Sequence, residues 1–218
     1  MAATKQFSGN TTDDIWQQVS ADLAGQEIFE YNVFLVQDGR KVELLIDIDL
    51  GGGFEGGYEF TYFKAPVALE HDFRFALHHQ GLIDTAGKFF GMEDVVIGYP
   101  EFDETLIIKT SDRERTRRIF SDVNVREIFQ SLRSFTLHLM HHHKEPFLEL
   151  TIEEGVIDTE VLRNLYDAFY KVLRGIEAGW ESEKNRRLFI PMALLNKSVF
   201  QHSSWLYGII LGLLLHPQ

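Results

Sequence analysis

The alternation of apolar and polar residues predicts a β-hairpin near the start of the chain. Strand-like runs at residues 27–37 and 41–50 are joined by Asp38-Gly39, a dipeptide that tolerates the positive φ angles of a tight hairpin turn. In the second run, apolar and mainly acidic positions alternate, which is typical of a strand with one face buried and one face in water. The apolar set is Val42, Leu44, Ile46, Ile48 and Leu50, and the acidic set is Glu43, Asp47 and Asp49.

Further strand-like runs follow along the chain. Residues 58–63 and 73–79 are rich in aromatic side chains, and we expect them to extend the hairpin into a meander of four strands paired in chain order. Residues 135–140 and 147–152 predict a second hairpin around a histidine-rich turn.

Helical periodicity marks three other segments. An amphipathic helix starts at Thr12 and ends at Gly25, and residues 82–90 predict a short helix. The longest helix starts at Asp158, and its apolar stripe is wide enough to cover a sheet. The first helix buries Ile15, Trp16, Val19 and Leu23, and the stripe of the longest is Val161, Leu162, Leu165, Ala168, Phe169, Val172, Leu173 and Ile176.

Residues 94–132 predict a strand, a turn, a second strand and two capped helices. Ser111 followed by Glu114 has the spacing of a capping box, and Asn124 with Glu127 repeats that spacing. We therefore expect helices to begin at these two positions.

The same segment resembles an uncharacterised bacterial domain family whose members are often attached to transmembrane helices. The family pattern is a hydrophobic strand, a Pro/Glu-Phe-acidic step, a second strand, an Asp, and a helix with Arg before an aliphatic pair. The matching positions here are 95–97, 100–103, 106–108, Asp112 and 118–120. The resemblance implies a bacterial source and brings no activity with it.

These elements together predict an α+β fold. We expect a mostly antiparallel sheet, made of the meander and hairpins, that helices cover on one face. The predicted domain spans residues 1–178, and residues 179–218 form a C-terminal extension with an apolar tail.

Composition narrows the classes of partner. The 218-residue chain has 21 basic and 33 acidic residues, a net charge of −12, which disfavours nucleic acid as a partner. Because cysteine is absent, disulfides, thiolate metal sites and a cysteine nucleophile are excluded. No apolar run follows the N-terminal Lys5, so we expect a cytoplasmic location, in contact with the inner face of a membrane if the tail anchors there.

A glycine run at residues 51–56 matches the dinucleotide-binding fingerprint literally. That chemistry needs a helix N-terminus directly after the glycines, whereas residues 58–63 predict a strand and Glu55 would repel phosphate. We therefore expect a hairpin loop and no cofactor.

Histidines supply the candidate metal ligands. On a strand, His138 and His142 would share one face, and Glu149 on the partner strand offers a carboxylate. The alternative is a solvated histidine-rich loop, since no established ligand spacing is present.

Two further groups of residues predict surface contacts. On a helix, Arg113 and Arg117 share one face, which predicts either contact with an anion or acidic headgroup, or an ordinary solvated face. Residues 205–215 carry no charge, yet a helix of that length covers only about half the hydrocarbon thickness of a bilayer. Trp205 and Tyr207 suit a membrane–water boundary, and Gly208 with Gly212 permits close helix packing. The tail is therefore an association or membrane segment, or is buried on the body.

The sequence contains no recognisable catalytic constellation, so the favoured hypothesis is a bacterial non-enzymatic binding or scaffold domain. Its expected partner is a membrane surface or a second copy of the chain. One alternative is a metal-dependent enzyme that uses residues 138–143, and the other is a carrier of a small ligand between the sheet and the longest helix.

Overall fold

The computed structural model describes residues 4–25, 27–52, 56–69, 72–79, 92–142 and 145–178, and for residues 141 and 142 it describes the backbone alone. Residues 1–177 form one unit and residues 178–218 another. The fold that follows is that of the first unit.

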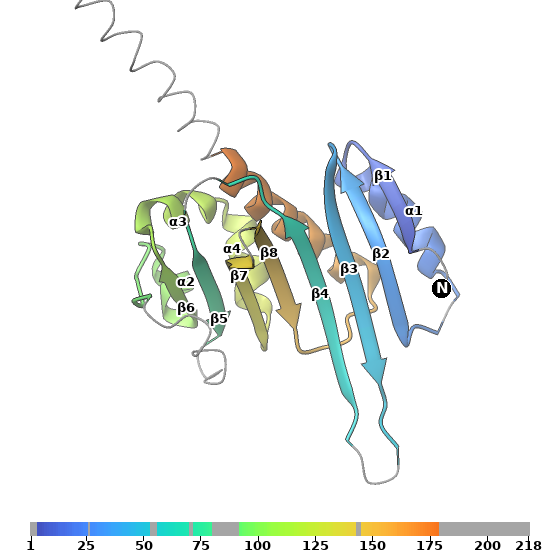
Figure 1. Cartoon of the computed structure of the whole chain (residues 1–218). Helices are drawn as coiled ribbons and strands as arrows, with labels where there is room; N and C mark the ends of the chain where they lie inside the picture. The colour runs from blue at the N-terminus through green and yellow to red at the C-terminus, as the bar shows by residue number, and fades with distance from the viewer. Residues whose placement is uncertain are drawn as a thin grey trace, which may run out of the picture. The chain divides into compact units, whose positions relative to one another are not determined.

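One sheet of eight strands runs through this unit (Figure 1). Its strand order is β1-β2-β3-β4-β8-β7-β5-β6; β1 pairs with β2 in parallel, and the other neighbouring pairs are antiparallel. The strands are β1 Lys5–Gly9, β2 Glu30–Gln37, β3 Arg40–Asp49, β4 Tyr58–Pro66, β5 Phe75–His79, β6 Leu106–Thr110, β7 Phe135–His142 and β8 Glu145–Ile152. The predicted mixed α and β content and mostly antiparallel sheet are confirmed, and β1 is a strand that the pattern did not predict.

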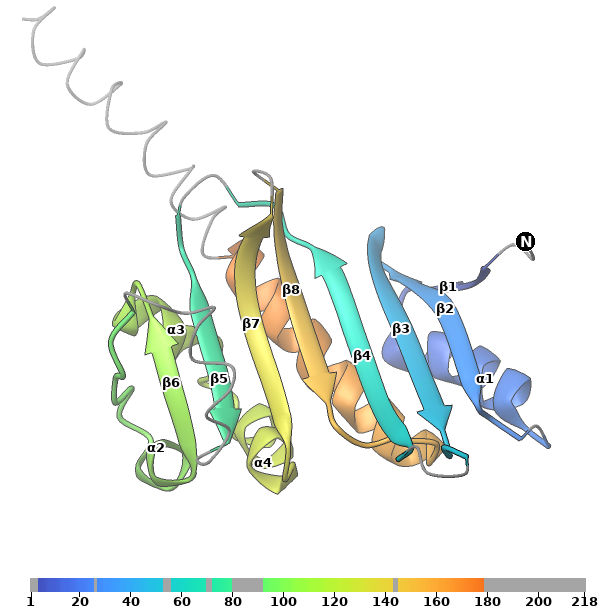
Figure 2. The same ribbon diagram turned by 60° about the horizontal axis from the view of Figure 1, so that its bottom comes forward.

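The helices gather on one side of this sheet. In Figures 1 and 2 the long helix, α1, α3 and α4 all lie on the same face, and no described helix covers the other. The helices are α1 Thr12–Leu23, α2 Pro100–Thr105, α3 Arg113–Ile119, α4 Val123–Ser131 and the long helix, which includes residues 159–178. We call the side of the sheet without described helices the open face.

The first hairpin forms as predicted. Asp38 and Gly39, with φ angles of 48° and 77°, make the tight turn between β2 and β3. Val42, Leu44 and Ile46 are fully buried, which confirms the alternation along β3. The prediction was wrong for Leu50, which is 76% exposed because it lies beyond the end of the strand.

The predicted meander continues to β4 and then stops. The prediction that β5 pairs beside β4 is wrong, because β8 pairs with β4 and β7 separates β8 from β5. The predicted hairpin of β7 and β8 therefore lies in the middle of the sheet. A tight turn specifies the pairing within a hairpin, whereas the neighbour of a hairpin is chosen by packing between distant segments.

Two predictions in residues 94–132 need correction. Residues 95–97 belong to no strand of the sheet; only an isolated bridge joins Asp94 to Lys109. The predicted turn at Pro100 is helix α2, since proline suits the first helical position, where no intrahelical N–H bond is needed. Asp103 in this helix accepts hydrogen bonds from the backbone N–H groups of residues 97–99, at 2.8–2.9 Å, and so folds the preceding loop.

The predicted helix caps are each displaced. Asp112 caps α3 by accepting the N–H of Arg115 at 2.9 Å, whereas the Ser111 hydroxyl accepts the N–H of Arg74 at 3.0 Å. Asp122, rather than Asn124, caps α4. Asp and Ser are comparable N-caps, so the tertiary contact of Ser111 beside β5 leaves the helix end to the neighbouring Asp112.

The long helix covers the sheet with the predicted stripe. Asp158 caps it through two backbone N–H bonds of 2.9 Å, and Phe169 packs on Phe63 of β4 with ring centroids 5.7 Å apart. Val161 is 45% exposed, so its place in the stripe was wrong, and the buried Tyr166 and Tyr170 were missed. The other seven predicted members of the stripe are buried.

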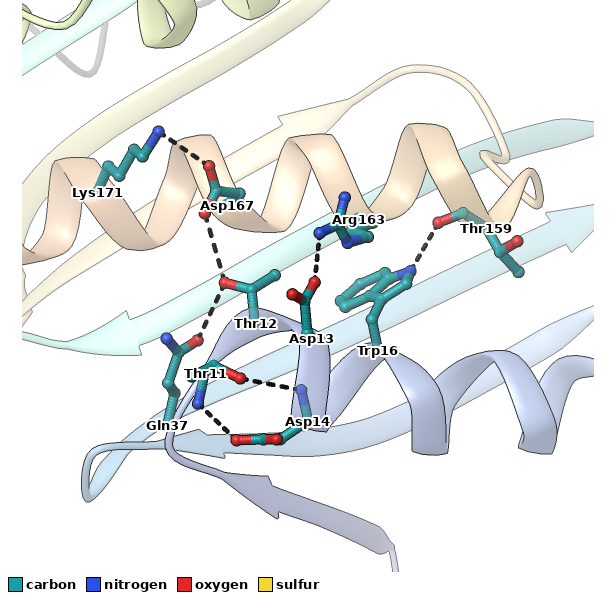
Figure 3. Close-up of polar contacts among 10 residues, drawn as sticks. All are labelled: Thr11, Thr12, Asp13, Asp14, Trp16, Gln37, Thr159, Arg163, Asp167 and Lys171. Carbon is teal, nitrogen blue, oxygen red and sulfur yellow. Dashed lines mark hydrogen bonds and ion pairs between the residues drawn. The ribbon is translucent and has the colours of Figure 1, made fainter.

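Polar contacts join α1 to the long helix (Figure 3). The indole N–H of Trp16 donates to the carbonyl of Thr159 at 2.6 Å, and Asp13 forms an ion pair with Arg163. Thr12 donates to the carboxylate of Asp167 at 3.3 Å. These contacts set the position of α1 beside the long helix, and they account for the polar side chains near its start.

We expect Phe169→Ala to lower the free energy of unfolding by about 3–5 kcal/mol, because it opens a cavity against Phe63. The matched control Val161→Ala, on the exposed side of the same helix, should change it by less than about 0.5 kcal/mol. Urea denaturation measures both. Equal losses would show that the two positions are not distinguished by burial.

Candidate functional site

A row of charged and polar side chains crosses the open face. Strand pairing places Glu43 of β3 opposite Lys64 of β4, Lys64 opposite Glu149 of β8, and Glu149 opposite His138 of β7. Each of them alternates with buried neighbours such as Leu148 and Leu150. Their side chains therefore lie on the opposite face of the sheet from these leucines, which is the open face.

Glu149 is the centre of this row. Its Oε2 lies 2.8 Å from Nε2 of His138, and its Oε1 lies 2.8 Å from Nζ of Lys64. Tyr62 donates its hydroxyl to the same Oε1 at 2.6 Å. Because a carboxylate only accepts hydrogen bonds, Nε2 of His138 carries a proton. Glu149 is 16% exposed and His138 10%, so the contacts are largely shielded from water.

These neighbours keep Glu149 ionised. Burial favours the neutral acid, but hydrogen bonds from His138, Lys64 and Tyr62 outweigh it and lower the pKa of Glu149 to about 2. The pKa of Tyr62 is raised, first by burial and then by its bond to Glu149. A carboxylate with so low a pKa is a poor proton acceptor at neutral pH. The arrangement therefore favours a fixed negative charge over proton transfer.

A pocket of about 270 Å³ lies next to this row on the open face. Two pairs of lysine and phenylalanine lie within it. Nζ of Lys41 is 3.4 Å from the ring centroid of Phe34, and Nζ of Lys64 is 4.1 Å from that of Phe147. The pocket is lined by Phe34, Lys41, Glu43, Lys64, Pro66, Glu145, Pro146 and Phe147. We call it the Lys41 pocket.

The charges in the Lys41 pocket are not all neutralised. Lys64 forms an ion pair with Glu149, but Lys41, Glu43 and Glu145 form no ion pair with any residue of the described segments. The pocket thus offers one unpaired ammonium and two unpaired carboxylates beside two aromatic rings. Cation–π contact holds the Lys41 ammonium over its ring without neutralising it.

The sequence prediction found only part of this site. His138 and Glu149 do come together, whereas Lys41, Lys64 and the aromatic walls were missed. The signal that could have revealed the walls is the placement of Phe34 and Phe147 at strand positions that alternation assigns to the wet face.

Of the three predicted metal ligands, His138 and Glu149 are in contact. Within the part of the chain that the structure describes, no group of three or more His, Asp or Glu side chains is placed to hold a metal ion. The side chain of His142, the third predicted ligand, lies outside the described atoms. The site stays a prediction.

The predicted arginine contacts have structural partners. Arg113 donates Nε to the carbonyl of Val96 at 2.5 Å, and the guanidinium of Arg117 lies 5.8 Å from the ring centroid of Tyr99. The nearby Arg115 is 4% exposed and donates to the carbonyl of Ile176 at 3.0 Å, which links α3 to the long helix. Binding of an anion by Arg113 and Arg117 stays a prediction.

Several predictions fall outside the described residues. These are the short helix at 82–90, residues 53–55 of the glycine run, and the tail with Trp205, Tyr207, Gly208 and Gly212. Strand β4 follows the glycine run, as expected, so no helix N-terminus is available there for a pyrophosphate. None of the helices in the described segments has the length and apolar character needed to cross a membrane.

The sequence matches no protein-family model and no curated protein. The resemblance of residues 94–132 to a bacterial domain family therefore stays a prediction.

We expect the stability that Glu149 contributes to fall at acid pH. Its pKa is about 2 in the folded state and 4.5 ordinarily, so the contribution, on the order of 3 kcal/mol, is present above pH 4.5 and is lost as the pH falls toward 2. Urea denaturation of the parent and of Glu149→Gln should show a difference at pH 7 that shrinks through this window.

Tyr62→Phe supplies the control. It removes one of the three hydrogen-bond donors to Glu149, so the loss of stability between pH 4.5 and 2 should be smaller than in the parent. A difference between parent and Glu149→Gln that is the same at pH 3 and pH 7 would contradict the assignment.

Proposed function

We propose that the protein is a non-enzymatic binding domain that takes its ligand in the Lys41 pocket on the open face of the sheet. The observation that carries the proposal is the set of unpaired charges on Lys41, Glu43 and Glu145 beside aromatic walls. Lys41 and Glu145 are exposed and Glu43 is half-buried, so a ligand in the pocket can reach and pair these charges. Concave sites with apolar walls and a few polar groups are typical of small-ligand binding.

Aromatic rings occupy the layer between the sheet and the long helix. The ring centroid of Tyr166 lies 5.4 Å from that of Trp16 and 6.5 Å from that of Phe63. These rings are buried and in contact. A carrier site between sheet and helix is therefore the weaker alternative.

The low pKa of Glu149 supports binding rather than catalysis. An ionised Glu149 holds Lys64 and His138 in place, and so forms a rigid edge to the Lys41 pocket. Association with a membrane or with a second copy of the chain remains a separate proposal, which depends on residues 205–215.

Mapping of amide chemical shifts tests the proposed site. We expect the small-molecule filtrate of a bacterial lysate to shift the amides of Lys41, Lys64 and Phe147 in the full-length protein, because these residues line the pocket. Lys41→Met should abolish the shifts. Lys109→Met is the matched control, since Lys109 lies on the same face at β6 and is paired with Asp94.

Shifts confined to the helices, or no shift with any fraction of the filtrate, would refute binding at the Lys41 pocket. Equal loss of the shifts in Lys41→Met and Lys109→Met would show a general effect of surface charge in place of a site.

A further inference from the structure

We infer that the ligand of the Lys41 pocket is a small zwitterion, an α-amino acid with an apolar side chain. The inference rests on the proposed function and adds the chemical class of the ligand. It follows from three properties of the pocket: unpaired charges of both signs, apolar walls, and a volume that suits one small molecule.

The carboxylate of the ligand pairs with Lys41. The ammonium of Lys41 is held 3.4 Å from the centroid of the Phe34 ring, so the position of this ammonium is restricted before the ligand arrives. Lys64 is less available, because Glu149 already contacts its ammonium at 2.8 Å. Among the described residues that line the pocket, Lys41 is the one cation without an ion pair, which suits one ligand carboxylate.

The ammonium of the ligand pairs with Glu43. Lys41 and Glu43 are two residues apart on β3, so their side chains point to the same face and their Cα atoms are roughly 7 Å apart. Because both side chains lie on the same face, one α-amino acid can pair its carboxylate with Lys41 and its ammonium with Glu43. Glu145 supplies a second negative charge at the rim of the pocket.

The side chain of the ligand lies against the apolar walls. Phe147, Pro66 and Pro146 present carbon surface, and the charge of the nearby Lys64 is balanced by Glu149. An uncharged, ring-bearing side chain fits this surface better than a charged one. The volume of about 270 Å³ is just below the range of sites for drug-sized ligands, which suits a single amino acid and is too small for a dinucleotide.

Calorimetric titration of the full-length protein with three matched probes tests the charges one at a time. The probes are L-phenylalanine, N-acetyl-L-phenylalanine, which lacks the ammonium, and L-phenylalaninamide, which lacks the carboxylate. We expect phenylalanine to bind, and each single-charge probe to bind at least about tenfold more weakly, since each loses a charge-assisted hydrogen bond.

Variants assign each charge to its partner. Lys41→Met should weaken the binding of phenylalanine and N-acetylphenylalanine by about tenfold and leave the binding of phenylalaninamide unchanged. Glu43→Gln should have the opposite selectivity, weakening phenylalanine and phenylalaninamide alone. Lys109→Met should bind all three probes as the parent does, because it is on the same face but outside the pocket.

The outcomes separate this inference from the proposed function. Equal affinity for phenylalanine and N-acetylphenylalanine, or for phenylalanine and its amide, overturns the zwitterion. If no probe binds while the lysate filtrate still shifts the amides of the pocket, the pocket is a binding site and the ligand class is wrong. If neither the probes nor the filtrate act there, both proposals fail.

Discussion

The contact between the long helix and the sheet is the constraint on which the rest of the structure depends. Phe169 and Tyr166 pack against Phe63 in the middle of the sheet, and Trp16 of α1 stacks on Tyr166 from the side. Each ring buries a large apolar area, so burial of these rings favours this position of the helix on the sheet. Because the described helices share that face, polar side chains lie on the opposite one, where those that are shielded from water need a partner.

Glu149 shows how the open face satisfies this demand. A largely buried carboxylate is costly unless it is paired, and here three donors from β4 and β7 surround it. This pairing consumes the charge of Lys64. One strand further toward the edge, Lys41 and Glu43 have no such arrangement, which is why the inferred ligand site lies there and not at the centre of the row.

Local signals in the sequence predicted the helices and strands more reliably than the contacts between distant segments. The turn at Asp38-Gly39 and the burial of Val42 and Leu44 follow from backbone preferences and period-two alternation, which need no knowledge of distant residues. The predicted cap of α3 was wrong because the choice of cap depends on a distant residue. Ser111 and Asp112 are nearly equivalent as helix caps, and a bond from Arg74, far away in the chain, decided between them.

By itself the sequence determined most of the described strands and helices, though not β1 or α2, and the apolar side of most of them, because these properties depend on side chains a few residues apart. Only the tertiary structure decided that β8 lies between β4 and β7, since that pairing joins segments far apart in the chain, as Thr61 and Ile152 show. The candidate site depends on that choice. Lys64 meets Glu149 across β4 and β8, and Phe147 faces Lys64 only because those two strands are neighbours.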